Sequence, residues 1–178
     1  GMGHLVRQCH IAKILQDRGA VITFFIPDYP PAESWLDRCQ FPREILNDPL
    51  TEKETGPLDI IILDIQDTSS AFIKKIKQGK KTVVSFEDCG EGRNHVDLLI
   101  DCNLEEKNSV DMSAQTLFGP DYSVLAPEFE ALHAKKRQFN RPIDSVLITF
   151  GGTDPHSLTP LLADKLLQIQ PNLSMTLL

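Results

Sequence analysis

Short apolar runs alternate with longer helical segments along almost the whole chain, and this alternation constrains the fold more than any other feature. The clearest run, 59–64, reads Asp-Ile-Ile-Ile-Leu-Asp, and the run 21–26 is rich in β-branched and aromatic residues. Such runs are typical of strands buried on both faces of a parallel sheet. The helical segments between them supply the crossovers that parallel strands need. The sequence therefore predicts an α/β fold built from βαβ units.

The expected elements follow from periodicity and from helix-stop and turn residues. The expected helices lie at 4–18, 32–38, 69–78, 127–138 and 157–169. The expected strands lie at 21–26, 43–46, 59–64, 82–86, 96–100, 116–118, 145–150 and 174–178. The remaining stretches are expected to be loops, turns or linkers: 27–31 with its three prolines, 51–57, 87–92, 105–115, 139–142 and 151–155.

The pattern restarts after the linker, which predicts two Rossmann-like domains. The first occupies 1–138, and 143–178 is the beginning of a C-terminal nucleotide-binding domain. A glycine turn that opens a helix normally follows a strand. We therefore expect a further strand upstream of Gly1, in the middle of a doubly wound sheet. Without that strand, the first domain would expose two strand edges.

Charge and composition exclude several classes of function. The net charge is −7 and the acidic residues are spread along the chain, which disfavours a nucleic-acid partner held by phosphate contacts. The four cysteines form no Cys-x-x-Cys pair and join no histidine cluster, so we expect free thiols, no metal site and no cofactor. No stretch reaches the roughly 18 apolar residues of a membrane helix, and no signal peptide precedes the first motif. We expect a cytoplasmic protein without a membrane span.

The chain opens with Gly1-Met2-Gly3-His4, a Gly-x-Gly turn at the start of a helix. Glycines here let the backbone approach a ligand closely. The positive end of the helix dipole favours a neutral imidazole at His4, which suits a general base. Arg7, three residues later, projects from the same side and would hold an anion or orient a carboxylate. The alternative is a short glycine turn with no ligand, or the remnant of an expression tag.

A second glycine turn, Gly151-Gly152-Thr153-Asp154, follows the strand at 145–150 and opens a helix. Backbone amides at such a turn form an anion site, for which a diphosphate is the natural occupant. Thr153 would donate to a phosphate oxygen, whereas Asp154 would cap the helix or orient a sugar hydroxyl. The alternative is a capped turn without a ligand. The turn lacks Gly-Lys-Ser/Thr and is therefore not a Walker-type loop.

Carboxylates follow two of the predicted strands. Asp64 ends the strand at 59–64, and Glu87 and Asp88 follow the strand at 82–86. Ligands of α/β proteins bind at the carboxyl ends of parallel strands. These carboxylates would bind a sugar or assist a proton transfer, or they would serve as capping and turn residues. We take Asp64 and Asp88 as candidate substrate-binding residues.

Three stretches of the chain together resemble one family. They read GMGHLVRQCHIAKILQDRGAVITF at 1–24, LFGPDYSVLAPEF at 117–129 and ITFGGTDPHSLTPLLADKLL at 148–167. In this order they resemble the UDP-2,4-diacetamido-2,4,6-trideoxy-altropyranose hydrolases of pseudaminic acid biosynthesis and their spore-coat-polysaccharide relatives. The resemblance implies a GT-B fold, in which two Rossmann-like domains enclose the active site. It also implies a metal-independent hydrolysis in which water attacks the anomeric carbon and UDP leaves.

The resemblance assigns roles to particular residues. It implies that His4 activates or positions the water, with Gly3 and Arg7 at its flanking positions. It also matches Tyr122 to a tyrosine near the cleft, and the turn at 151–154 to the loop on the diphosphate side.

The sequence departs from the family pattern at two places. Ala126 stands where the family's middle motif has arginine, and 87–88 reads Glu-Asp where the family often has Asp-Asp. Both departures bear on which sugar is bound and on whether water is the acceptor.

Three functions remain open at this stage. The first is a nucleotide-sugar hydrolase, and the second is a GT-B glycosyltransferase that uses the same cleft with a sugar or lipid acceptor. The third is a non-catalytic nucleotide-sugar-binding module of a fused protein, for which a sugar-activating domain in the same chain is the expected fusion partner. The predicted small-molecule partner is in each case a nucleotide sugar.

Overall fold

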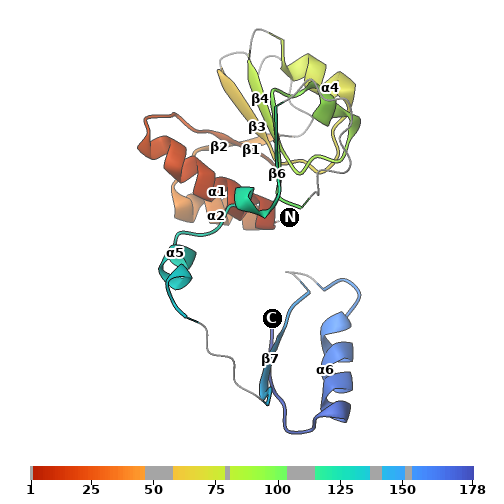
Figure 1. Ribbon diagram of the computed structural model, residues 1–178. Coiled ribbons are helices and arrows are strands. Elements are labelled where there is room, and N and C mark those ends of the chain that lie inside the picture. The colour runs from red at the N-terminus through yellow and green to blue at the C-terminus, as the bar shows by residue number, and fades with distance from the viewer. Residues whose placement is uncertain (1, 47–57, 79–80, 104–114, 137–141, 151–153) are drawn as a thin grey trace. The chain divides into compact units, whose positions relative to one another are not determined.

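The computed structural model describes residues 2–46, 58–78, 81–103, 115–136, 142–150 and 154–178 (Figure 1). The chain divides into two compact units, Gly1–Phe129 and Glu130–Leu178. All strand pairs described in both units are parallel, as the alternation of apolar and helical segments predicts. Parts of the predicted loops lie outside the described residues. These are the loop at 51–57, residues 105–114 of the loop at 105–115, and residues 139–141 of the linker at 139–142.

The first unit contains short strands and helices in alternation. Its elements are α1 (Met2–Asp17), β1 (Phe24–Pro27), α2 (Pro30–Cys39), β2 (Arg43–Leu46), β3 (Ile60–Leu63), α4 (Ser70–Ile76), β4 (Thr82–Phe86), η1 (Glu91–His95), β5 (Leu98–Asp101), β6 (Gln115–Phe118) and η3 (Pro120–Tyr122). Helix α5 (Glu128–His133) spans the division between the units. The second unit contains β7 (Ser145–Ile148), α6 (Leu158–Ile169) and β8 (Ser174–Leu177).

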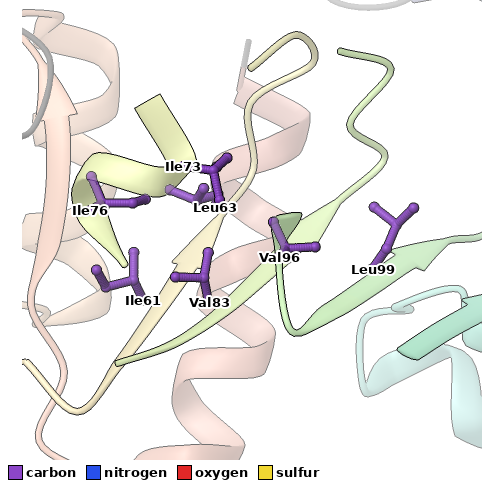
Figure 2. Close-up of a cluster of buried hydrophobic side chains, with 7 residues drawn as sticks. All are labelled: Ile61, Leu63, Ile73, Ile76, Val83, Val96 and Leu99. Carbon is purple, nitrogen blue, oxygen red and sulfur yellow. The ribbon is translucent and has the colours of Figure 1, made fainter. Parts of the chain in front are cut away.

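A four-stranded parallel sheet in the order β3-β4-β5-β6 carries the main core of the first unit. Helix α4 packs on it and contributes Ile73 and Ile76, which are fully buried (Figure 2). The strand and loop side chains of this cluster are Ile61, Leu63, Val83, Val96 and Leu99. Burial of one such side chain stabilises the fold by about 1.5–3 kcal/mol. This core fixes where the carboxyl ends of β3 and β4 lie.

Helix α4 begins where the sequence predicts. Ser69 precedes it in an extended conformation, and its hydroxyl accepts a hydrogen bond from the amide of Phe72 at 3.1 Å. This is the N-cap contact that serine provides. Ile73 and Ile76 are three residues apart, so both face the sheet.

A second cluster lies between α1, α2 and the two-stranded sheet β1-β2. The buried face of α1 carries Cys9 and Ala12, and Leu5 packs against this cluster. Leu36 of α2 is fully buried in the same cluster. Helix α1 begins at Met2, so Gly3 and His4 of the predicted glycine turn lie in its first turn rather than in a separate loop.

Two boundaries in this region differ from the prediction. The strand expected at 21–26 begins only at Phe24, and Val21 is 97% exposed. Pro30 and Pro31, expected in a loop, form the start of α2. Proline has no amide hydrogen, and the first amides of a helix have no partner within the helix, so proline is well tolerated there.

The two sheets of the first unit share a cavity rather than hydrogen bonds. Among the described strands, β1 pairs with β2 and β3 pairs with β4. A cavity of about 890 Å³ is lined by β1, by β3 and by one side of α1, and most of its lining is apolar. The amide of Phe24 donates to Pro42, on the β2 side, so the next residue, Phe25, presents its amide toward the cavity. The strand that the sequence predicts upstream of Gly1 stays a prediction.

The second unit is a single βαβ segment. Strands β7 and β8 pair in parallel from Ser145↔Ser174 to Ile148↔Leu177, and α6 connects them. Its buried side chains are Ile148, Ala163 and Leu173. The strand predicted at 145–150 ends at Ile148. Both units thus have the parallel α/β architecture of Rossmann-like folds.

No helix in the described part of the chain combines the length and the apolar character needed to cross a membrane.

Candidate functional site

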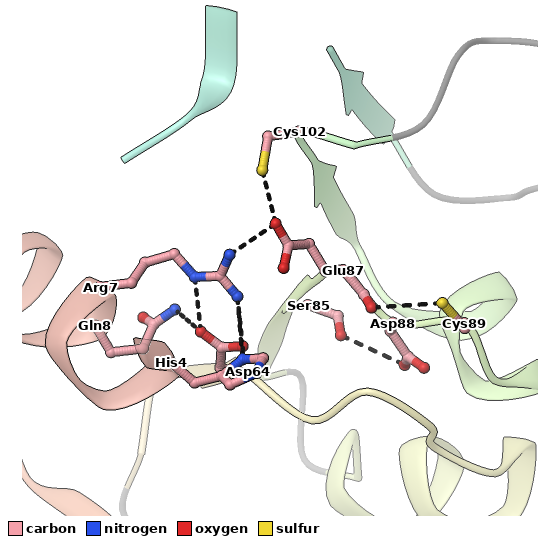
Figure 3. Close-up of polar contacts among 9 residues, drawn as sticks. All are labelled: His4, Arg7, Gln8, Asp64, Ser85, Glu87, Asp88, Cys89 and Cys102. Atoms are coloured by element: carbon pink, nitrogen blue, oxygen red, sulfur yellow. Dashed lines mark hydrogen bonds and ion pairs between the residues drawn. The ribbon is translucent and has the colours of Figure 1, made fainter. Parts of the chain in front are cut away.

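The candidate site lies where the carboxyl ends of β3 and β4 meet the first turns of α1. Asp64 follows β3 and Glu87 follows β4, and these strands are hydrogen-bonded neighbours. His4, Arg7 and Gln8 stand on α1 at positions i, i+3 and i+4, so they share one face of the helix. Figure 3 shows these side chains converging on Asp64. The predicted residues His4, Arg7 and Asp64 are therefore brought together.

Asp64 is the centre of this group. Its Oδ1 atom lies 2.7 Å from Arg7 Nη2 and 2.5 Å from His4 Nδ1. Its Oδ2 atom accepts from Arg7 Nε at 3.0 Å and from Gln8 Nε2 at 2.8 Å. The side chain is only 8% exposed, and burial alone would raise its pKa. The hydrogen bonds from Arg7, Gln8 and His4 outweigh burial and hold the pKa of Asp64 below its ordinary value.

His4 is oriented by this carboxylate. An ionised Asp64 can only accept hydrogen bonds, so the proton shared across the 2.5 Å contact is assigned to Nδ1 of His4. Arg7 Nη2 also lies 3.3 Å from Nδ1, but a donor cannot bond a protonated nitrogen, and the shorter contact decides the tautomer. The lone pair is then on Nε2, and the side chain is 44% exposed. This is the arrangement of a histidine that accepts a proton from a bound molecule.

Arg7 joins the two strand ends. Its Nη1 atom lies 2.7 Å from Glu87 Oε1, while Nε and Nη2 bind Asp64. Its guanidinium also lies over the Phe86 ring, 5.5 Å from the centroid. Burial opposes its charge, yet the bonds that Arg7 donates to Asp64 and Glu87 raise the pKa of Arg7 above its ordinary value. Of the two roles that the sequence leaves open, the geometry is that of orienting carboxylates.

Glu87 belongs to the site, although the sequence analysis chose its neighbour. Its backbone is in the left-handed region, with φ 49°, and its amide donates to Ile100 at 2.9 Å. Its carboxylate accepts from Arg7 and from the Cys102 thiol, 2.6 Å away. Burial would raise the pKa of Glu87, but these two partners lower it overall. Burial and the contact with Glu87 raise the pKa of Cys102, so the thiol is the donor.

Asp88 points into the protein. It is fully buried and accepts from the amides of Thr68 at 3.1 Å and Gly90 at 2.8 Å, and from the Thr68 and Ser85 hydroxyls. A Cβ built on Gly90 would lie 2.3 Å from the Thr68 carbonyl, so the loop is packed too tightly there for a side chain. Asp88 thus ties the two loops after β3 and β4 together. Its predicted contact with a substrate stays a prediction.

Gly3 and Tyr122 were predicted beside the site. A Cβ on Gly3 would meet nothing within 4 Å, so open space adjoins the first turn of α1. Tyr122 ends η3, which follows β6, and is 42% exposed. The described contacts of the His4–Asp64 group do not include Tyr122. Both assignments stay predictions.

The second glycine turn is described only at its end. Gly151, Gly152 and Thr153 lie outside the described residues. Asp154 accepts from the amides of Leu158 and Thr159, both at 2.8 Å, and so caps α6. This is one of the two roles that the sequence gives to Asp154. Diphosphate binding at the turn stays a prediction.

Within the described residues, no three or more His, Cys, Asp or Glu side chains are grouped so that they could hold a metal ion. The cysteines among these residues are free thiols.

Two curated proteins are similar to the chain over most of its length. It is 28% identical over 167 residues to the spore coat polysaccharide biosynthesis protein SpsG of Bacillus subtilis, covering 89% of this chain and 49% of that protein. It is 26% identical over 182 residues to an uncharacterized protein of Methanocaldococcus jannaschii, covering 94% of this chain and 37% of that protein. No protein-family model matches the sequence. The chain thus spans about half, or less, of the length of these relatives.

Proposed function

We propose that this chain is part of a nucleotide-sugar hydrolase that releases UDP from a modified amino sugar by attack of water at the anomeric carbon. The observation that carries the proposal is the pairing of His4 Nδ1 with Asp64, because it leaves Nε2 as a base on a part-exposed ring. Water must reach the acceptor side of a hydrolase, whereas a transferase has to exclude it.

The reaction follows from this pair. His4 Nε2 takes a proton from water as the water oxygen bonds to the anomeric carbon. The bond from that carbon to the diphosphate oxygen breaks, and UDP leaves with the electron pair. Asp64 stabilises the imidazolium that forms, as the carboxylate does in a Ser-His-Asp triad.

The charge of the site suits a sugar rather than a phosphate. Arg7 carries one positive charge against the two negative charges of Asp64 and Glu87, so the group has a net charge of −1 when His4 is neutral. Glycosidic cleavage builds positive charge on the sugar ring, which this site would stabilise. In this proposal the diphosphate binds instead at the predicted turn 151–154, as the sequence pattern indicates, and backbone amides there stabilise the departing charge.

The similarity to a spore coat polysaccharide biosynthesis protein supports a substrate of the sugar class. Because the chain spans about half of that relative, we assign the complete reaction to the full-length protein.

The test is release of UDP from candidate UDP-sugars by the full-length protein without an acceptor. We expect release that persists in a metal chelator and is lost in His4→Ala. His10→Ala, on the same helix, is the matched control and is expected to keep the activity. Release that requires an added sugar or lipid acceptor would identify a glycosyltransferase instead. Tight UDP binding without turnover would identify a binding module and contradict the proposal.

A further inference from the structure

The strongest feature that the proposed reaction does not use is the link from Asp64 through Arg7 to Glu87. Arg7 places two guanidinium nitrogens on Asp64 and the third on Glu87. A planar guanidinium has a fixed fork of donors, so a partner on one edge restricts the position of the other edge. The side chain of Arg7 is 16% exposed and that of Glu87 is 20% exposed, so both are largely removed from water.

Glu87 is itself held in an uncommon conformation. A residue other than glycine rarely adopts φ 49°, and such residues persist where the surrounding structure fixes them. Here the Glu87 amide is bonded to Ile100 of β5, and the next residue is the buried Asp88. In Figure 3, Glu87 projects toward Arg7 while Asp88 points the other way. The loop therefore aims one carboxylate at the site and uses the next as an anchor.

We propose that Glu87 is a positioning residue, which acts through Arg7 to hold Asp64 in line with Nδ1 of His4. Arg7 is accordingly a positioning residue too, because each of its three nitrogens contacts one of the two carboxylates. In its catalytic consequence this inference rests on the proposed function.

Glu87 also contributes charge. The charged and titratable groups that face it are Arg7 and His4 from α1, Asp64 after β3 and Cys102 after β5. With Glu87 ionised, a proton on His4 brings the group to neutrality, whereas without that charge the same proton leaves a net positive charge. Removal of the Glu87 charge therefore leaves the imidazolium that forms without a balancing charge, which should lower kcat.

The test compares three variants of the full-length protein. Glu87→Gln removes the charge at nearly constant size, and Glu87→Asp keeps the charge but shortens the reach to Arg7. Glu91→Gln is the matched control, an exposed glutamate four residues later, in η1. Thermal unfolding of each variant separates a loss of function from a loss of fold.

We expect Glu87→Gln to lower kcat about 10- to 100-fold, as misplaced catalytic groups do, with KM nearly unchanged. Glu87→Asp keeps the balancing charge, so its kcat should fall less than that of Glu87→Gln. A raised KM with an unchanged kcat would show that Glu87 contacts the substrate, and would overturn the inference. So would a kcat for Glu87→Gln that matches that of Glu91→Gln.

A second readout does not depend on turnover. Nitrogen NMR of the histidine ring reports which nitrogen carries the proton. We expect one Nδ1-protonated form of His4 in the wild type and a mixture of tautomers in Glu87→Gln. Equal spectra would overturn the positioning role even if no UDP-sugar is hydrolysed, whereas a changed spectrum without any turnover would support it and count against the proposed reaction alone.

Discussion

Asp64 and Asp88 follow neighbouring strands of one sheet, yet their surroundings differ in kind. Asp64 is bound by side chains from another element, and its partner His4 is 44% exposed. Asp88 is fully buried and accepts from backbone amides and hydroxyls of the adjoining loops. A carboxylate bound to a part-exposed histidine can stabilise the proton that the histidine takes up, whereas a buried carboxylate held by its own loops maintains the shape of the chain. The position of a carboxylate at a strand end therefore does not indicate its function unless its hydrogen-bond partners are also known.

The largest expected effect separates the two residues by one substitution. Asp64→Asn removes the negative charge that fixes Nδ1 of His4, and we expect kcat/KM for UDP release to fall about 10²- to 10⁴-fold. Asp88→Asn should leave kcat/KM within a small factor, because an amide oxygen still accepts from Thr68 and Gly90 while the amide group donates to the hydroxyls. Asp59→Asn, exposed at the other end of β3, is the control. Equal losses of kcat/KM in Asp64→Asn and Asp88→Asn would contradict the difference in role between the two residues.

The second effect concerns stability, and here the larger loss is expected at Asp88. Asp88→Ala removes the acceptor of the buried Thr68 amide and of the part-buried Gly90 amide, and we expect the free energy of unfolding to fall by about 2–4 kcal/mol. Denaturant unfolding measures this change, with Asp88→Asn as the isosteric reference. A free energy of unfolding for Asp88→Ala within error of the wild type would mean that the loops do not depend on this carboxylate.

The third effect is a dependence of stability on pH. The folded-state pKa values of Asp64 and Glu87 lie below their ordinary values of 3.8 and 4.5. Their contribution to stability is therefore present above those ordinary values and is lost as the pH falls through the lowered ones. Arg7→Met removes the largest of the contacts that lower the two pKa values, so the loss of stability between pH 5 and pH 3 should be smaller than in the wild type. The check is denaturant unfolding at several pH values, and an unchanged slope would contradict the role of Arg7.

The smallest effect on stability is expected at Asp154, which, like Asp88, accepts hydrogen bonds from backbone amides of its own segment. It caps α6 through the amides of Leu158 and Thr159. Asp154→Ala should lower the thermal midpoint slightly, and Asp154→Asn should lower it less, since asparagine also caps helices well. A fall in UDP affinity in Asp154→Ala that is far larger than the fall in stability would show that Asp154 contacts the ligand and does more than cap α6.

Much of the fold is predictable because apolar runs mark buried strands. The strands at 43–46 and 82–86 have the predicted boundaries. The prediction was wrong where local signals compete: Pro30 and Pro31 indicate a loop but also fit the first turn of a helix. The apolar residues at 21–22 extend a strand pattern into a segment whose Val21 side chain is exposed.

The site was predictable only where its residues share an element or end a strand. His4 was indicated by the glycine turn and Arg7 by its helical spacing from His4, and the same spacing indicates Gln8, at i+4, which was missed. The left-handed backbone of Glu87 decides that Glu87, and not Asp88, faces α1. This backbone conformation is set by the folded loop, so the sequence did not indicate Glu87 in place of Asp88. The Cys102 contact comes from the packing of β5 beside β4 and has no signal in the sequence.

The cavity between β1 and β3 has a practical consequence for these 178 residues as an isolated polypeptide. Unpaired strand edges are templates for backbone pairing with other chains. A preparation of this polypeptide alone should thus self-associate as its concentration rises, and light scattering should detect this before any change in helix content. Solubility would then be limited by backbone amides and carbonyls that have no strand to pair with. Surface charge substitutions would improve it less than an added strand that fills the cavity.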